Sequence, residues 1–170
     1  MKIDKIEVGY LQTNCYFITK NNDLIVVDPG DDYEKIKDKI GNFNLKAVFL
    51  THNHFDHNGA LEQLLNDYEA PVNPTKIESF NYEIISTPGH KEDSSTFYFP
   101  NEKTMFTGDF LFYQTIGRTD LPGGNNKDMQ ESLEKIKKYD DDITLYPGHG
   151  PETILGNEKL RFGKYLSSLS

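Results

Sequence analysis

Several short apolar runs of this chain are each followed, two to four residues later, by a histidine or an aspartate. The runs at residues 47–50, 83–86, 104–107 and 143–146 are followed by Thr51-His52-Asn53-His54-Phe55-Asp56-His57, Thr87-Pro88-Gly89-His90, Gly108-Asp109 and Pro147-Gly148-His149. Their composition predicts short strands. Loops at strand ends can present side chains without disturbing a core. The sequence therefore predicts that the chemistry of this chain lies at the ends of its strands.

The remaining segments predict a layered α/β protein. We expect further strands at residues 5–8, 15–18, 24–27 and 96–99, and helices at 33–40, from about residue 58 through Leu61, Leu64 and Leu65, at 128–139 and around 158–166. A loop rich in glycine and asparagine is predicted at 117–126. This order of elements favours helices outside two packed sheets, within a single domain spanning residues 1–170.

All five histidines of the chain lie in these strand-end segments. An isolated histidine is most often a surface residue or a hydrogen-bonded core residue, but that explanation would have to hold five times here. Three histidines and Asp56 fall within six residues, which is typical of a metal site. Cys15 is the only cysteine, and its apolar strand predicts a core position for it. We therefore expect nitrogen and oxygen ligands, which suit zinc and also iron or manganese.

The net charge of the chain indicates which kinds of molecule it can bind. It has 27 acidic and 18 basic side chains, for a net charge of -9. Such a balance repels phosphate backbones, so we expect no nucleic-acid or anionic-membrane binding and favour a small-molecule substrate. The N-terminal residues show neither a secretory signal nor a membrane span, which predicts a cytoplasmic location. The oligomeric state is left open.

The strand-end motifs resemble those of the metallo-β-lactamase fold hydrolases, whose signature is the H-x-H-x-D-H run seen here as residues 52–57. Asp28-Pro29-Gly30, Thr87-Pro88-Gly89-His90, Thr107-Gly108-Asp109, the loop from Gly117 to Gly124 and Pro147-Gly148-His149-Gly150 occur in the same order as in that family. The greatest similarity is to the glyoxalase II-like, or hydroxyacylglutathione hydrolase-like, subgroup. Only 21 residues follow His149, so we expect the C-terminal helical domain of full glyoxalase II enzymes to be missing.

The resemblance implies a four-layer αββα sandwich and a centre of two divalent metal ions, of which zinc is the favoured one. One ion would be held by His52, His54 and His90, and the other by Asp56, His57 and His149, with Asp109 bridging the two. Asp56 and Asp109 are thus the candidate catalytic carboxylates as well as ligands. Asp28 either accepts the second N–H of a ligand histidine or simply starts a turn, and the resemblance favours the first role.

The predicted function is that of a small thioester hydrolase, in which a hydroxide shared by two metal ions attacks the acyl carbonyl. A mononuclear iron persulfide dioxygenase is the main alternative. A phosphodiesterase or nuclease and a non-catalytic binding module are less favoured. Arg118 and Lys91 are candidates for contacting an acidic group of the substrate, although bracing of the loop against Asp120 is the favoured role for Arg118.

Overall fold

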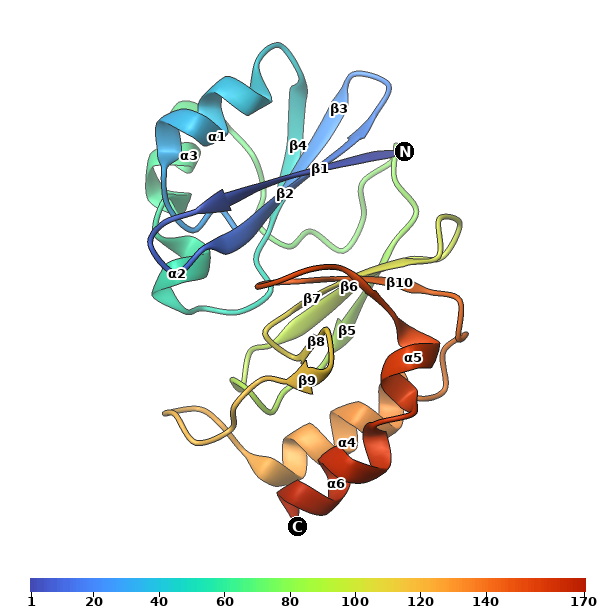
Figure 1. Ribbon diagram of the computed structural model, residues 1–170. Coiled ribbons are helices and arrows are strands. Elements are labelled where there is room, and N and C mark those ends of the chain that lie inside the picture. Colours follow the sequence, from blue (N-terminus) through green and yellow to red (C-terminus); the bar gives the residue numbers. More distant parts are fainter. The chain divides into compact units, whose positions relative to one another are not determined.

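The computed structural model describes residues 1–170, which divide into two units, Met1–Tyr82 and Glu83–Ser170. Figure 1 draws the first unit from blue to green and the second from green to red. The expected single domain stays a prediction. None of the helices combines the length and the apolar character that a membrane crossing requires. The expected cytoplasmic location also stays a prediction.

The first unit contains a four-stranded sheet in the order β1-β2-β3-β4. Its elements are β1 (Lys2–Val8), β2 (Thr13–Lys20), β3 (Asp23–Val27), α1 (Tyr33–Ile40), β4 (Asn44–Phe49), α2 (Phe55–Asn58) and α3 (Leu61–Asp67). The first three strands pair antiparallel, whereas β3 and β4 are parallel and are connected through α1. This parallel pair places the C-terminal ends of β3 and β4 at the same end of the sheet.

One face of this sheet is covered by α1 and α3. Ile36 and Ile40 of α1 and Leu64 of α3 are buried in one apolar cluster with side chains of β2 and β3, among them Phe17 and Val26. Cys15 belongs to the same cluster, and burial raises the pKa of its thiol well above the usual value. It is a core residue, as its apolar strand predicts.

The second unit contains a five-stranded sheet in the order β11-β10-β7-β6-β5 and a small β8-β9 ribbon. Its elements are β5 (Glu83–Ser86), β6 (Ser95–Phe99), β7 (Thr104–Gly108), β8 (Leu111–Phe112), β9 (Thr115–Ile116), α4 (Asn126–Ile136), β10 (Thr144–Pro147), β11 (Thr153–Ile154), α5 (Leu155–Lys159) and α6 (Phe162–Leu169). Strands β7 and β10 are parallel. Helices α4 and α6 lie side by side (Figure 1) and share one apolar cluster with Met105 and Leu145 of the sheet.

Two predicted helices are interrupted. The helix expected from residue 58 is instead two short helices, α2 and α3, separated at Gly59 and Ala60. A side chain at Gly59 would meet the carbonyl oxygen of Gly30 at 2.4 Å, and the Ala60 N–H donates to the Pro29 carbonyl. The terminal helix expected at 158–166 is likewise divided into α5 and α6. The break between α2 and α3 is therefore fixed by contacts with residues 29 and 30, which are distant in the sequence. Apolar periodicity does not encode such contacts.

Candidate metal centre

Asp28 is placed by the parallel pairing of β3 and β4. Val27 and Phe49, the last residues of the two strands, are paired in register, so Asp28 and Thr51 follow at the same end of the sheet. The Asp28 N–H continues the ladder by donating to the Phe49 carbonyl at 2.9 Å. Asp28 has a φ of 52°, a left-handed conformation that aspartate tolerates better than most residues.

The buried carboxylate of Asp28 accepts three hydrogen bonds. Its Oδ1 accepts from the Thr51 N–H at 2.8 Å, and its Oδ2 accepts from Thr51 Oγ1 at 2.7 Å and from His57 Nδ1 at 2.8 Å. The Thr51 hydroxyl hydrogen is thereby committed, so Oγ1 can only accept from His52 Nδ1, 3.1 Å away. One carboxylate therefore puts the proton on Nδ1 of both histidines and leaves Nε2 as the nitrogen suited to a metal.

The first unit gathers three imidazoles and one further carboxylate. The His52 ring centroid lies 4.7 Å from that of His54 and 4.2 Å from that of His57. Ligand nitrogens of His52 and His54 are within 4.8 Å of each other. His57 Nε2 is 3.3 Å from Asp56 Oδ2, which accepts from Thr13 Oγ1 at 2.9 Å. These four residues form the N-terminal ligand group of the site.

In the second unit, parallel strands again bring two ligand candidates to one end of a sheet. Strand β7 ends at Gly108 and β10 at Pro147, and these two residues are partners in the ladder. The Gly148 N–H donates to the Gly108 carbonyl at 2.8 Å. Asp109 and His149 follow, and Asp109 Oδ2 lies 3.5 Å from His149 Nε2.

His90 completes the C-terminal ligand group. Its Nδ1 lies 2.8 Å from the Arg118 carbonyl oxygen. Because a carbonyl oxygen can only accept, Nδ1 is the donor, and the lone pair of the ring is on Nε2. That Nε2 is 3.6 Å from Asp109 Oδ2. A single carboxylate oxygen of Asp109 is therefore almost equidistant from the Nε2 atoms of His90 and His149.

The donor set fits divalent metal ions. His57 Nε2 faces Asp56 Oδ2, and His90 Nε2 faces Asp109 Oδ2. In both pairs the neutral imidazole turns a lone pair toward a carboxylate oxygen, an arrangement that becomes favourable when a cation lies between the two atoms. Imidazole nitrogen and carboxylate oxygen are ligands that zinc, iron and manganese accept.

Two glycines lie against the backbone of the two candidate carboxylates. A Cβ at Gly30 would come within 1.7 Å of the Asp56 carbonyl oxygen, and a Cβ at Gly117 within 1.7 Å of the Asp109 carbonyl oxygen. Real Cβ atoms do not approach so closely, so only glycine permits either contact. Both glycines belong to motifs noted in the sequence, but this role was not evident there.

Thr13 and Thr51 were also missed as functional residues. Thr51 precedes the histidine run and transmits the position of Asp28 to His52. Thr13 lies on β2 and bonds to Asp56, 43 residues further along the chain. No motif marks Thr13, whereas the position of Thr51 next to the histidine run was a usable signal.

The two candidate substrate-binding cations have partners within their own loops. Arg118 donates from Nε to Asp120 Oδ1 at 2.7 Å and from its terminal nitrogen to Oδ2 at 2.8 Å. These bonds lower the pKa of Asp120 to about 2. The Lys91 Nζ is 3.6 Å from a carboxylate oxygen of Glu92. Contact of either cation with a substrate stays a prediction.

Comparison with known proteins identifies the family. The family model described as metallo-beta-lactamase superfamily matches residues 8–74 and 73–149. The hydroxyacylglutathione hydrolase GloC of Haemophilus influenzae is 30% identical over 213 residues, covering 100% of both chains. The predicted resemblance to the hydroxyacylglutathione hydrolases is thereby confirmed.

Two solved structures are similar to this chain along most of its length. The BLEG-1 B3 metallo-beta-lactamase is 28% identical with a TM-score of 0.87, and the match covers 92% of this chain and 96% of that one. TTHA1623, solved in a di-iron-bound form, is 28% identical with a TM-score of 0.81, covering 91% and 96%. The predicted metallo-β-lactamase fold is confirmed, and the chain belongs to the metallo-beta-lactamase superfamily.

Proposed function

We propose that this protein is a metal-dependent hydrolase of small acyl thioesters. The observation that carries the proposal is Asp109, whose Oδ2 lies 3.6 Å from His90 Nε2 and 3.5 Å from His149 Nε2. An oxygen this close to two ligand nitrogens suits a carboxylate shared by two cations. The relative from Haemophilus influenzae, named a hydroxyacylglutathione hydrolase, supports a thioester as the substrate class.

The proposed ligands are those implied by the family motifs. His52, His54 and His90 would hold one divalent ion, and Asp56, His57 and His149 the other, with Asp109 shared. The fixed tautomers of His52, His57 and His90 support this assignment, since each directs its Nε2 lone pair away from the residue that holds its Nδ1. Zinc is the proposed metal, and the same donors also suit iron or manganese.

The bound ions would lower the pKa of a water molecule to about 7 and polarise the acyl carbonyl. The role of the chain is to hold the ligands in place. Asp28 orients His57 directly and His52 through Thr51. Thr13 restrains Asp56. The one thiol of the chain, Cys15, is buried in an apolar cluster and has a raised pKa, so it is unsuited to covalent catalysis.

The first experiment is release of free thiol from S-lactoylglutathione by protein loaded with zinc, iron or manganese, with bound metal quantified in the same samples. We expect the rate to follow the metal content. His54→Ala and Asp109→Asn should lower both metal content and rate, the first by removing an imidazole and the second by replacing a shared carboxylate with a neutral amide. Asp38→Asn, on an exposed position of α1, is the control.

Three outcomes would contradict this proposal. Metal-filled protein that releases no thiol from S-lactoylglutathione or from other lactoyl thioesters is not a thioester hydrolase of this kind. Oxygen consumption with glutathione persulfide by the iron-loaded protein, without thioester hydrolysis, would favour the persulfide dioxygenase. An Asp109→Asn variant with full metal content and full rate would contradict the shared-carboxylate assignment.

A further inference from the structure

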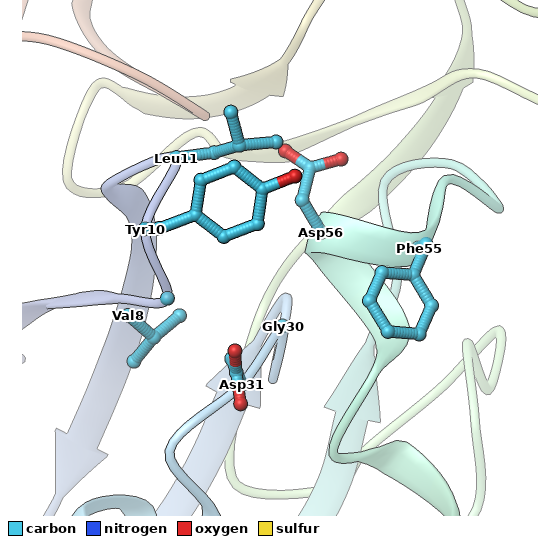
Figure 2. A pocket seen from close by; sticks show the side chains of 8 residues that line it. Val8, Tyr10, Leu11, Gly30, Asp31, Phe55 and Asp56 are labelled. Atoms are coloured by element: carbon cyan, nitrogen blue, oxygen red, sulfur yellow. The ribbon is translucent and has the colours of Figure 1, made fainter.

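The first unit has a pocket of about 210 Å³ beside the proposed ligand Asp56. Val8 at the end of β1 and residues 9–11 of the β1-β2 turn form one side, Gly30 and Asp31 line it from the loop after β3, and Phe55 and Asp56 line it from α2. Figure 2 shows the Tyr10 ring beside Leu11 at the centre of this region, with its hydroxyl end on the side of Asp56.

Large apolar side chains surround the pocket and are poorly covered. Tyr10 is 91% exposed, Phe55 80% and Leu11 50%. Single exposed apolar residues are ordinary, but three of them around one pocket indicate a binding surface that removes water from the apolar part of a ligand. Tyr10 and Phe55 add aromatic faces, which attract organic cations as well as apolar groups.

The charged residues that line the pocket are both acidic. They are Asp31 and Asp56, and no lysine, arginine or histidine is among its lining residues. Asp56 is engaged by Thr13 and faces His57. Asp31 is therefore the carboxylate that a ligand in the pocket would meet. This combination of aromatic rings and a carboxylate complements a cation and repels a carboxylate or a phosphate.

The wall of the pocket is held in position before any ligand arrives. The Gly9 N–H donates to Asp32 Oδ2 at 2.9 Å, which ties the β1-β2 turn to the loop after β3. Within the turn, the Gln12 N–H donates to the Gly9 carbonyl at 3.2 Å. The Asp32 N–H donates to Asp31 Oδ1 at 2.7 Å, which orients that carboxylate. A preformed site loses less entropy on binding than a mobile loop.

We propose that this pocket binds an organic ammonium group carried by the thiol part of the substrate. The inference rests on the proposed thioester hydrolase function and specifies its substrate class as thioesters of cationic thiols. The ammonium group would lie between the rings of Tyr10 and Phe55 and near Asp31, in the pocket that the proposed ligand Asp56 also lines.

The test compares isosteric substrates that differ only in charge. S-lactoylthiocholine carries a trimethylammonium group, and the lactoyl thioester of 3,3-dimethylbutanethiol carries a neutral group of the same shape. Each kcat/KM is divided by the rate constant for hydroxide hydrolysis of the same compound. We expect wild-type protein to prefer the cation by about fivefold, the effect of one exposed cation-aromatic and carboxylate contact. The lactoyl thioester of 3-mercaptopropionate should be the poorest substrate.

Asp31→Asn should reduce the preference for the cation to about twofold, because the cation-aromatic contact remains when the carboxylate is removed. Asp38→Asn is the matched control and should keep the wild-type preference. Equal normalised rates for the two isosteres in wild-type protein would overturn the proposal, as would an undiminished preference for the cation in the Asp31→Asn protein. Faster hydrolysis of the anionic thioester would also overturn it.

A binding measurement separates this inference from the proposed function. Tetramethylammonium should shift the backbone amide NMR signals of Gly9, Tyr10 and Phe55, and Asp31→Asn should weaken the response. Those shifts without hydrolysis of any thioester would retain the cation site and reject the hydrolase. Hydrolysis of thioesters without those shifts would retain the hydrolase and reject the cation site.

Discussion

Replacement of Asp28 by asparagine keeps the size of the side chain but turns an acceptor into a donor. Oδ1 of the carboxylate accepts from the Thr51 N–H, and Oδ2 accepts from Thr51 Oγ1 and His57 Nδ1. If the amide oxygen occupies the Oδ1 position, the NH2 group faces His57 Nδ1. That nitrogen must then accept, so the proton moves to Nε2 and the metal ligand loses its lone pair.

The magnitude follows from this tautomer change. Loss of a hydrogen bond that orients a ligand histidine typically lowers metal affinity by about 10- to 100-fold, which corresponds to about 1.4 to 2.7 kcal/mol. If the amide instead turns its oxygen toward His57, its NH2 group faces the buried Thr51 N–H. In the folded protein the amide NH2 group and the Thr51 N–H then face each other as two donors without an acceptor. This lowers the free energy of unfolding by about 1 to 3 kcal/mol. Asp28→Asn must therefore lower either metal affinity or stability.

Two assays distinguish these branches. Competition with a chromophoric chelator at pH 7 measures the zinc affinity, and urea unfolding of the metal-free protein measures stability. Asp38→Asn removes the same charge from an exposed helix position and should change stability by less than about 0.5 kcal/mol. An Asp28→Asn protein with wild-type zinc affinity and wild-type stability would refute the assignment of Asp28 as the group that fixes the histidine tautomers.

Three further predictions concern single positions. Gly30→Ala places a Cβ 1.7 Å from the Asp56 carbonyl oxygen, so thermal unfolding should show a loss of about 1 to 3 kcal/mol and dialysed protein should retain less zinc. Asp120 should titrate at about 2 by carboxyl NMR, and Arg118→Gln should raise its pKa toward 3.8, because the guanidinium is the main cause of the shift. The pKa of Asp120 is lower in the folded than in the unfolded protein. The Arg118–Asp120 pair therefore stabilises the folded state fully above pH 3.8, and this stabilisation is lost as the pH falls through about 2. Glu158→Ala removes a buried carboxylate that accepts from a backbone N–H and a hydroxyl, and urea unfolding should show a loss of about 2 to 4 kcal/mol.

The elements that the sequence predicts best are those with local signals. The helix Tyr33–Ile40 and the strand Glu83–Ser86 have the predicted bounds, because apolar spacing and flanking polar residues define both. Helix α4 begins at Asn126 rather than residue 128, since the Asn125 side chain caps it by accepting from the Asp128 N–H. Strands β8, β9 and β11 are only two residues long, too short for any periodicity to indicate.

The ligand types of the proposed centre can be predicted from the sequence, whereas the residues that support these ligands cannot. Histidines and aspartates placed after apolar runs are visible one segment at a time. The bond from Thr13 to Asp56 depends on the pairing of β2 within the sheet and on the path of α2, which no local pattern records. The charged subsite around Asp31 was missed for the same reason, since the β1-β2 turn and the loop after β3 meet only in the folded chain.

The loop after β3 links the supports of the proposed centre to the proposed recognition pocket. Asp28 orients a ligand histidine, Gly30 lies against the backbone of Asp56, and Asp31 lines the pocket. The proposed metal ligation and the proposed recognition of the thiol part would therefore depend on three residues within a stretch of four. A substitution that moves this loop should change metal affinity and substrate preference together, whereas Asp31→Asn, which keeps the backbone, should change preference alone. That difference separates a role in recognition from a role in holding the loop.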